Sequence, residues 1–357
     1  MKTTSIQITI GIDLGDKKHA ICVLDSRNEI IEERSITNDI ESLRRLSKKH
    51  PGALIVFEVG THSPWTDRAF RSWGHEVIIA NPRKVRAIYQ NDRKCDRRDA
   101  MMLAKLANFD RAMLYPVQHQ SEQAQRDILR IKMRDSLVRR RVDLISTVRC
   151  TLKSMGVTTK CVNTNYFARH LRRDLAGKHD DLLELLKPIL DSITELTHQI
   201  QTLDSDIQQL AAERYPETGR LSQITGVGVI TSLTFLLVVG DPERFLSPRD
   251  IGAYLGLVPK RDQSGDLDKE MRISKAGHSY LRQLLVGSAQ YILGPFGPDC
   301  DLRARGLELI ARGGKRAKKK AVVATARKLS VVMLTLLREK TDYDACRNKR
   351  ETKAVPA

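Results

Sequence analysis

Four acidic residues in the first hundred positions have the types and spacing of a divalent-metal site. They are Asp13, Glu58, Asp96 and Asp99. Asp13 ends an alternating apolar stretch, and Glu58 directly follows the apolar run ALIVF. Asp96 and Asp99 are three residues apart, so they share one face of a helix. Carboxylates without histidine or cysteine select Mg²⁺ or Mn²⁺. Two such ions, about 3.5 to 4 Å apart, can activate an attacking oxygen and stabilise a leaving oxygen in phosphodiester cleavage.

Each of these positions also has a simpler interpretation or a rival. Asp13 could be a turn residue chosen to pair with Gly15. The two aspartates near position 97 could be favoured at a solvated helix start by the helix dipole. Other acids compete for the same roles, namely Asp16 for the first position, Glu76 for the second and Asp92 for the last pair.

The elements that must position these acids alternate between strand and helix, which predicts an α/β domain. Alternating or continuous apolar runs predict strands, and 3.6-residue periodicity predicts helices. The expected strands are 8–13, 20–24, 29–33, 53–57 and 75–80, with helices at 40–50 and 61–73. The stretch 91–107 begins polar and becomes helical. Functional side chains gather at the carboxyl ends of strands in such sheets. Asp13 and Glu58 both occupy such ends.

A second group of candidate residues surrounds Ser264, which precedes Gly265 in a polar stretch that predicts a loop. A serine before a glycine is usually a turn residue, and no activating base is identifiable around it. The neighbouring cations suit a phosphate substrate. They are Lys260, Arg261, Lys269, Arg272 and Lys275.

The middle of the chain is helical by pattern. Residues 122–155 predict a long arginine-rich helix that completes the first domain and presents Arg139, Arg140 and Arg141 to phosphates, or else forms a solvated face. A looser segment, 156–178, follows. Then comes a heptad seam, which favours a coiled coil between two copies over pairing within the chain. Its residues are Leu186, Ile189, Ile193, Leu196, Ile200, Leu203, Ile207 and Leu210.

Composition points to a polyanionic partner. The 357 residues carry 61 lysines and arginines against 43 acids, a net charge of +18. Nucleic acid is the default partner for such a surplus, and the basic stretch 303–328 is the preferred contact. No apolar run is long enough for a membrane span. The six cysteines show no zinc spacing and are expected to be reduced thiols of a cytoplasmic protein.

Several motifs in the same order resemble one family over nearly the whole chain. They read GIDLGDKKHAICVLD, VFEVG, KCDRRDA and LGLVP, followed by QSG and RISKAGHSYLRQLL. The chain is similar to the DEDD-serine transposases of the insertion sequence one-ten group and its one-eleven-eleven branch, relatives of the Piv DNA invertases. Cys95 and His278 depart from the threonine and asparagine frequent in that family, and neither is a proposed ligand.

The resemblance implies an RNase H-like, RuvC-type domain over 1–157 and a mostly helical transposase domain over 215–340. The heptad seam places a linker with a coiled coil over 158–214 between them, and the last residues predict a flexible tail over 341–357. The acidic tetrad then falls on the four acids named above, and the catalytic serine falls on Ser264. The implied partners are donor DNA, target DNA and a structured guide RNA, the bridge RNA. A dimer or tetramer is also implied, acting in the bacterial cytoplasm and at the nucleoid when bound to DNA.

Three other functions fit parts of the sequence. A plain RuvC-like nuclease needs the same acids without the serine. Actin-like kinases and chaperone ATPases share the GIDLG opening but need a second phosphate loop, for which no convincing candidate exists. A non-enzymatic nucleic-acid-binding protein needs only the net charge of +18.

Overall fold

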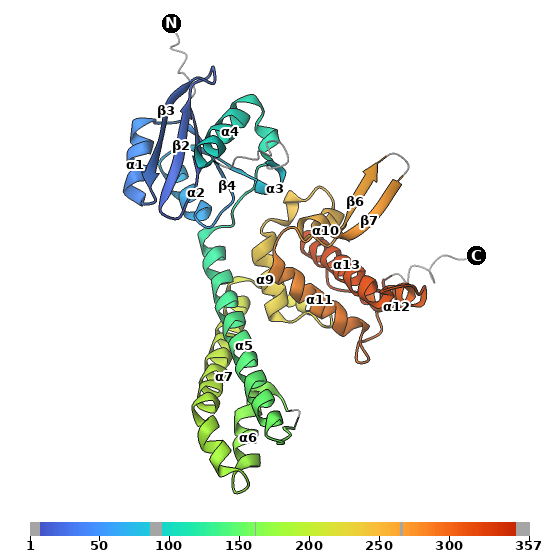
Figure 1. Ribbon diagram of the computed structural model, residues 1–357. Helices are drawn as coiled ribbons and strands as arrows, with labels where there is room; N and C mark the ends of the chain where they lie inside the picture. Colours follow the sequence, from blue (N-terminus) through green and yellow to red (C-terminus); the bar gives the residue numbers. More distant parts are fainter. Residues whose placement is uncertain (1–7, 86–94, 161, 265–266, 348–357) are drawn as a thin grey trace, which may run out of the picture. The chain divides into compact units, whose positions relative to one another are not determined.

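The computed structural model describes residues 8–85, 95–160, 162–264 and 267–347, with only the backbone over 262–264 and 267–270 (Figure 1). The chain divides into two compact units, Met1–His119 and Gln120–Ala357. Along the described residues, no helix has both the length and the apolar character needed to cross a membrane.

The first unit is built on a five-stranded sheet of order β3-β2-β1-β4-β5, with β1 to β3 antiparallel and β1, β4 and β5 parallel. This confirms the expected α/β arrangement of this unit, and β3 is longer than expected. The strands are β1 (Thr9–Asp13), β2 (Lys18–Leu24), β3 (Ile30–Thr37), β4 (Leu54–Glu58) and β5 (Glu76–Ala80). The helices are α1 (Ile40–Lys49), α2 (Ser63–Ser72), α3 (Pro82–Val85) and α4 (Asp96–Phe109), with a 3₁₀ turn η1 (Arg111–Leu114).

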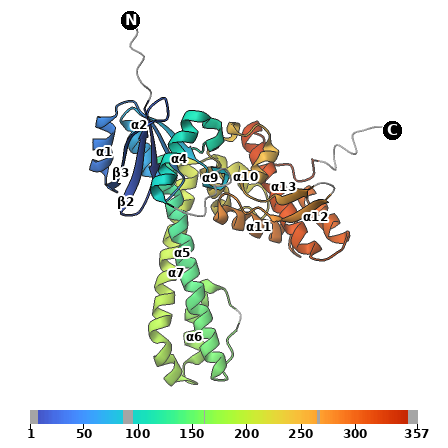
Figure 2. The same cartoon turned by 45° about the horizontal axis from the view of Figure 1, so that its top comes forward.

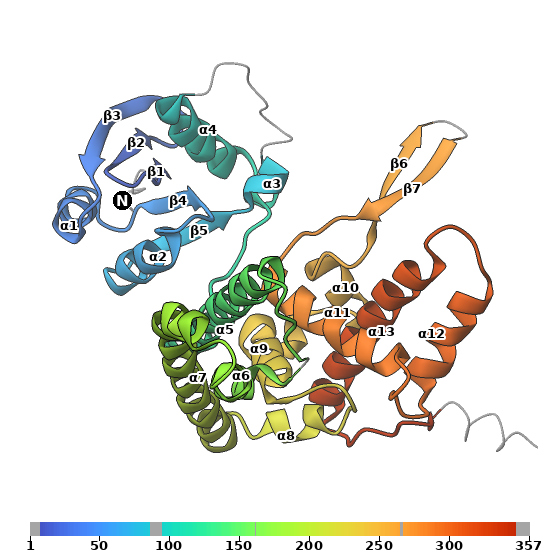
Figure 3. The ribbon, with the colours of Figure 1, turned by 60° about the horizontal axis from the view of Figure 1, so that its bottom comes forward.

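Helices cover both faces of this sheet because its central strands are apolar on both sides. On one face, the odd residues of β4 and the even residues of β1 pack on α1 and α2; this core includes Ile10, Ile12, Ile55, Phe57, Leu43 and Phe70. On the other face, α4 covers the sheet, and its core includes Leu54, Val56, Ile78, Leu103 and Leu106. Figure 3 shows α4 on the opposite side of the sheet from α1 and α2.

The second unit opens with two long helices, α5 (Glu122–Ser154) and α7 (Asp180–Arg214), which lie antiparallel (Figures 1 and 2). The short helix α6 (Phe167–Leu175) packs beside their far end, after the 3₁₀ turn η2 (Thr164–Tyr166), where the sequence predicted a loose segment. By its contacts, α5 belongs to this unit rather than to the first, which we expected it to complete.

The heptad seam of α7 is buried within the chain, so our preference for a contact between two copies is corrected. At one end, Leu186, Leu190 and Ile193 pack on α5 and α6. At the other end, Ile207 and Leu210 pack on α5 and on α9 (Val229–Val239). The heptad spacing of α7 indicates that one face of the helix is buried. It does not indicate which helix packs on that face, because the partner residues lie in α5, about 60 positions earlier.

The rest of the second unit is mostly helical around one large core (Figure 3). Its helices are α8 (Glu217–Ser222), α10 (Ile251–Tyr254), α11 (Ser279–Leu293), α12 (Asp301–Ala311) and α13 (Ala317–Glu339), with 3₁₀ turns η3 (Pro242–Arg244) and η4 (Pro248–Asp250). The polar stretch expected as a loop is instead an antiparallel hairpin of β6 (Pro259–Ser264) and β7 (Leu267–Ile273). In the tail, the Asp301 backbone N–H donates to the carbonyl of Ala345 at 2.8 Å, and residues 348–357 lie outside the described part.

Candidate active site

Asp13 and Glu58 end two adjacent parallel strands on the same face of the sheet. The register pairs Ile12 of β1 with Phe57 of β4, so the two acids are the next residues of each strand. Side chains alternate between faces along a strand. Thr9 and Gly11, which share the face of Asp13, contact α4, as do Leu54 and Val56, which share the face of Glu58. Both acids are half-buried, on the face of the sheet that α4 covers.

Helix α4 runs antiparallel to β1, and two contacts fix the position of the helix on the strand. The Thr9 hydroxyl donates to Asn108 Oδ1 at 2.6 Å, near the end of the helix. A Cβ added at Gly11 would lie 1.9 Å from the carbonyl oxygen of Ala100. Only glycine therefore lets the helix backbone approach the strand this closely.

This placement puts the first turn of α4 at the same height along β1 as Asp13. Four helix residues rise about 6 Å, which matches two residues of a strand. The step from Ala100 back to Asp96 therefore corresponds to the step from Gly11 to Asp13. Asp99 lies in the same first turn and is half-buried, whereas Asp96 is exposed. The four predicted acids thus come from two strand ends and one helix start at the same edge of the sheet.

Complete metal coordination is not formed among the described residues. No three acidic, histidine or cysteine side chains there are grouped closely enough to hold an ion. The donor set itself, four carboxylates without a softer ligand, suits a hard divalent cation.

Two of the rival acids lie in other settings. Glu76 begins β5, where it pairs with Leu54 at the amino end of β4, and its carboxylate accepts from Arg111 at 2.6 Å. That is the opposite edge of the sheet from Asp13. The side chain of Asp16 is 95% exposed and lies 3.1 Å from His62. Asp92 lies outside the described residues.

A histidine that we did not predict orders the loops that follow the two acidic strand ends. The indole N–H of Trp65 donates to His62 Nδ1 at 3.3 Å, so the His62 Nε2 carries the proton and donates to Asp16 at 3.1 Å. The Asn38 amide donates to the carbonyls of Gly15 and Asp16. These bonds tie the turn after β1 to the loop after β4. No spacing in the sequence indicates them, because they join three segments of the chain.

A buried histidine lies beside this cluster. His19 on β2 has no exposed surface, and its ring centroid is 6.4 Å from that of His62. Burial, together with the neighbouring His62, lowers the pKa of His19. The ring is therefore neutral in the folded protein at pH 7, which avoids burying a charge.

Ser264 lies at the end of β6, opposite Leu267 of β7, in the second unit. Its four acidic partners in the predicted chemistry belong to the first unit. Lys260, Arg261, Arg272 and Lys275 of the hairpin and its base are all exposed.

The base of the hairpin is held by close backbone contacts. Gly256 and Gly277 both have positive φ, and an added Cβ would lie 2.2 Å from the Ala276 nitrogen and 2.0 Å from the Tyr254 carbonyl oxygen, respectively. From α11, Arg282 donates to the carbonyl oxygens of Leu255 (3.0 Å) and Ala276 (2.7 Å). The two strands therefore start from a fixed base, which positions the backbone of Ser264.

The basic residues predicted to contact phosphates differ in exposure. On α5, Arg139 and Arg140 are exposed, as expected, whereas Arg141 is buried. Arg141 is 5% exposed and donates to Asn165, Thr164 and Thr197, so it is structural rather than a phosphate ligand. By contrast, the turn between α12 and α13, together with the first residues of α13, exposes six cations and no acid. They are Arg312, Lys315, Arg316, Lys318, Lys319 and Lys320.

Two family models match the chain. A transposase model of the DEDD IS110 type covers residues 10–156, and the transposase model of the IS116/IS110/IS902 family covers residues 218–298. The first includes all four acids and the second includes Ser264.

Relatives match over longer stretches. The transposase of insertion sequence element IS1111A from Coxiella burnetii is 27% identical over 337 residues, 94% of this chain and 90% of the relative. A Sinorhizobium fredii protein described as the transposase y4qE is 30% identical over 293 residues, 78% of this chain and 70% of the relative. The chain belongs to the IS110/IS1111 family of transposases. A pilin gene-inverting protein of Moraxella bovis is 25% identical over 295 residues, 82% of this chain and 81% of the relative.

Family membership makes this chain a DNA transposase, an enzyme that recombines DNA. A DEDD-type domain also implies the use of divalent metal in general. The expectation about the family, drawn from the motifs alone, is confirmed.

Proposed function

We propose that this transposase cleaves and rejoins DNA strands with Ser264 as nucleophile, assisted by divalent metal held at Asp13, Glu58, Asp96 and Asp99. The observation that carries the proposal is the meeting of two acidic strand ends with the first turn of α4 on one face of the sheet. The strand order, with three antiparallel and two further parallel strands, supports an RNase H-like, RuvC-type domain.

The acids would act as ligands because oxygen donors from two strand ends and one helix start, without a softer ligand, suit a hard divalent cation. Four carboxylates at one edge repel one another unless cations lie between them or some bind protons. Bound Mg²⁺ or Mn²⁺ would polarise the scissile phosphate and stabilise negative charge on its oxygens. Gly11 would keep the helix near enough for Asp96 and Asp99 to face the strand ends.

The serine step transfers the phosphate between two oxygens. The Oγ of Ser264 attacks phosphorus, the bond from phosphorus to a deoxyribose oxygen breaks, and the hydroxyl proton ends on the departing oxygen. One DNA end is then a phosphoserine ester and the other is a free hydroxyl. Attack by the free hydroxyl of another strand reverses the step and regenerates the serine.

The exposed cations of the hairpin and of the turn between α12 and α13 would bind the phosphates of donor and target DNA. A structured guide RNA is part of the proposal, and its pairing with DNA would select the sequence while the protein reads backbone shape. The proposal includes a dimer or tetramer, in which the acids of one copy and the serine of another would act on the same phosphate.

The test compares each proposed ligand with an acid that the structure places outside the proposed site. Asp13→Asn should lower metal-dependent strand cleavage of a plasmid carrying the element ends by at least about a hundredfold, because several kcal/mol of charge stabilisation is removed. The matched change Asp16→Asn, in the adjacent turn, should leave cleavage within about twofold of wild type. Glu58→Gln and Glu76→Gln form a second pair with the same expectation.

Equal losses in both members of a pair would remove the acids from the mechanism. Cleavage with hydrolysed ends and full independence from Ser264 would favour a RuvC-like nuclease instead. Tight DNA binding without any metal-dependent chemistry would favour a non-enzymatic binding protein.

A further inference from the structure

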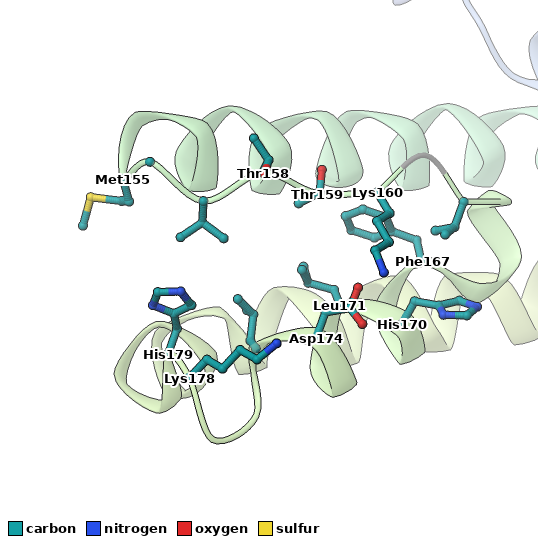
Figure 4. A pocket seen from close by; sticks show the side chains of 14 residues that line it. Met155, Thr158, Thr159, Lys160, Phe167, His170, Leu171, Asp174, Lys178 and His179 are labelled. Atoms are coloured by element: carbon teal, nitrogen blue, oxygen red, sulfur yellow. The ribbon is translucent and has the colours of Figure 1, made fainter.

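A cavity of about 420 Å³ lies in the second unit, between the loop that follows α5 and helix α6 (Figure 4). Its floor is apolar, because Phe167, Leu171 and Leu175 belong to the core of the α5–α7 pair and are 1%, 5% and 1% exposed. The volume falls in the range of small-ligand sites, roughly 300 to 1,000 Å³. The loop supplies the opposite wall.

Charged groups of both signs line this cavity. Lys160 from the loop and Asp174 from α6 point toward one another across it, and Lys178 extends its amine toward the same space (Figure 4). Asp174 also accepts from the guanidinium of Arg173 at 3.3 Å. The cavity therefore offers a hydrogen-bond acceptor and two ammonium donors above an apolar floor.

His170 adds another donor at the wall. The Arg173 guanidinium donates to His170 Nδ1 at 3.1 Å, so the neutral ring carries its proton on Nε2. The residues that line the cavity include two lysines, Lys160 and Lys178, against one carboxylate, Asp174. A bound ligand should therefore be anionic overall while presenting at least one hydrogen-bond donor to Asp174.

We propose that this cavity binds one unpaired nucleotide of a nucleic-acid strand. A nucleobase has an apolar face for the floor and an edge with donors and acceptors for Asp174 and Lys160, and its phosphate would pair with Lys178. This inference rests on the proposed function, since it takes the ligand from the nucleic acid that the transposase engages. An unpaired base is favoured over one in a duplex, because the edge of a paired base is occupied and its extrusion costs a few kcal/mol.

The direction in which one substitution changes the affinity distinguishes this site from nonspecific electrostatic attraction. Asp174→Ala removes a negative charge, so nonspecific electrostatics predicts tighter binding of every nucleic acid. Loss of a hydrogen-bonding partner for the base predicts weaker binding of single strands, by about tenfold. The control Glu184→Ala removes an exposed acid of α7 outside the cavity.

The experiment measures the affinity of the full-length protein by fluorescence anisotropy at fixed salt. The probes are a labelled single-stranded DNA of mixed sequence, about 15 nucleotides long, and the blunt duplex made from it; this length covers the usual site sizes of single-strand binders. We expect Asp174→Ala to weaken single-strand binding and to leave duplex binding equal or tighter. Glu184→Ala should slightly tighten both.

A second pair of variants guards against a folding defect. Lys178→Ala and Lys153→Ala each remove one exposed lysine from the same unit, and only Lys178 lines the cavity. Lys178→Ala should weaken single-strand binding more, at an unchanged melting temperature. Equal effects of the paired variants on both probes would overturn the nucleotide site while leaving the proposed function intact. Failure of the wild-type protein to bind any nucleic acid would contradict both.

Discussion

At the level of single residues, the position of Asp96 and Asp99 relative to the acidic strand ends depends on Gly11, which has no functional side chain. Gly11→Ala would place a methyl group 1.9 Å from the Ala100 carbonyl oxygen, so α4 must move away from β1. We expect a loss of about 1 to 3 kcal/mol in the free energy of unfolding of the first unit. Strand cleavage should fall by more than the unfolded fraction explains, because Asp96 and Asp99 move with the helix.

The control for this change is Gly60→Ala, two residues after Glu58, where a Cβ would meet nothing within 4 Å. Denaturant unfolding and plasmid cleavage measure both variants. A Gly11→Ala protein as stable and as active as Gly60→Ala would show that the close approach of α4 is unimportant.

The sequence indicated where the acids would lie in the fold, but not the contacts that hold the elements around them. Asp13 and Glu58 were found because each follows an apolar run that reads as a buried strand, and the parallel register placed them together. The rival Glu76 could not be dismissed from the sequence, since its position at the amino end of β5 depends on strand boundaries. The contact of Gly11 with Ala100 joins residues almost 90 positions apart, and no local pattern indicates it.

At the level of elements, His278 is the N-cap residue of α11. Its Nδ1 accepts the backbone N–H of Leu281 at 3.2 Å, the bond that an asparagine cap would make. Burial, with the charges of Lys132 and Arg282, lowers the pKa of His278. The cap needs the neutral ring, because a protonated Nδ1 cannot accept.

The pKa of His278 is below the unfolded value of about 6.5, so the unfolded chain binds the proton more tightly. The stabilisation is therefore complete above about pH 6.5 and is lost as the pH falls through the folded pKa. His278→Asn should keep the cap within a few tenths of a kcal/mol and remove this part of the acid sensitivity. His278→Ala should cost about 1 kcal/mol at pH 8.

Thermal unfolding of the three proteins between pH 5 and pH 8 measures the effect. If the stability difference between wild type and His278→Asn stayed constant with pH, the cap would not titrate.

The turn between α12 and α13 concentrates positive charge at a helix start, where the helix dipole already disfavours cations. A bound polyanion would offset this cost. We expect Lys319→Ala to weaken DNA binding and to reduce the slope of log affinity against log salt by about 1. Lys187→Ala, an exposed lysine on α7, should leave the slope unchanged; equal slopes for both variants would exclude the turn from the DNA contact.

The seam of α7 shows why element identity is easier to predict than element partners. Its 3-4 spacing correctly indicated a long helix with one buried face. The partner is α5, whose apolar residues Ile131, Ile145, Val148 and Leu152 complete the core. Arginines are interspersed among them, so the sequence did not indicate α5 as the partner. Likewise, alternation in the charged stretch 259–273 was too polar to indicate the hairpin that carries Ser264.

At the level of the whole molecule, we assign metal chemistry to one unit and the nucleophile to the other. A net charge of +18 provides the attraction to DNA that both units need. Under this assignment, residues of both units act on one phosphate of the bound DNA.

Recovery of the covalent protein–DNA intermediate tests the serine mechanism most directly. The wild-type transposase is incubated with a plasmid carrying the element ends and Mg²⁺, denatured, digested and analysed by mass spectrometry. We predict a nucleotide joined through phosphate to the peptide containing Ser264, formed only with divalent metal and absent from Asp13→Asn. Cleaved DNA with free ends and no adduct on Ser264 would contradict the mechanism.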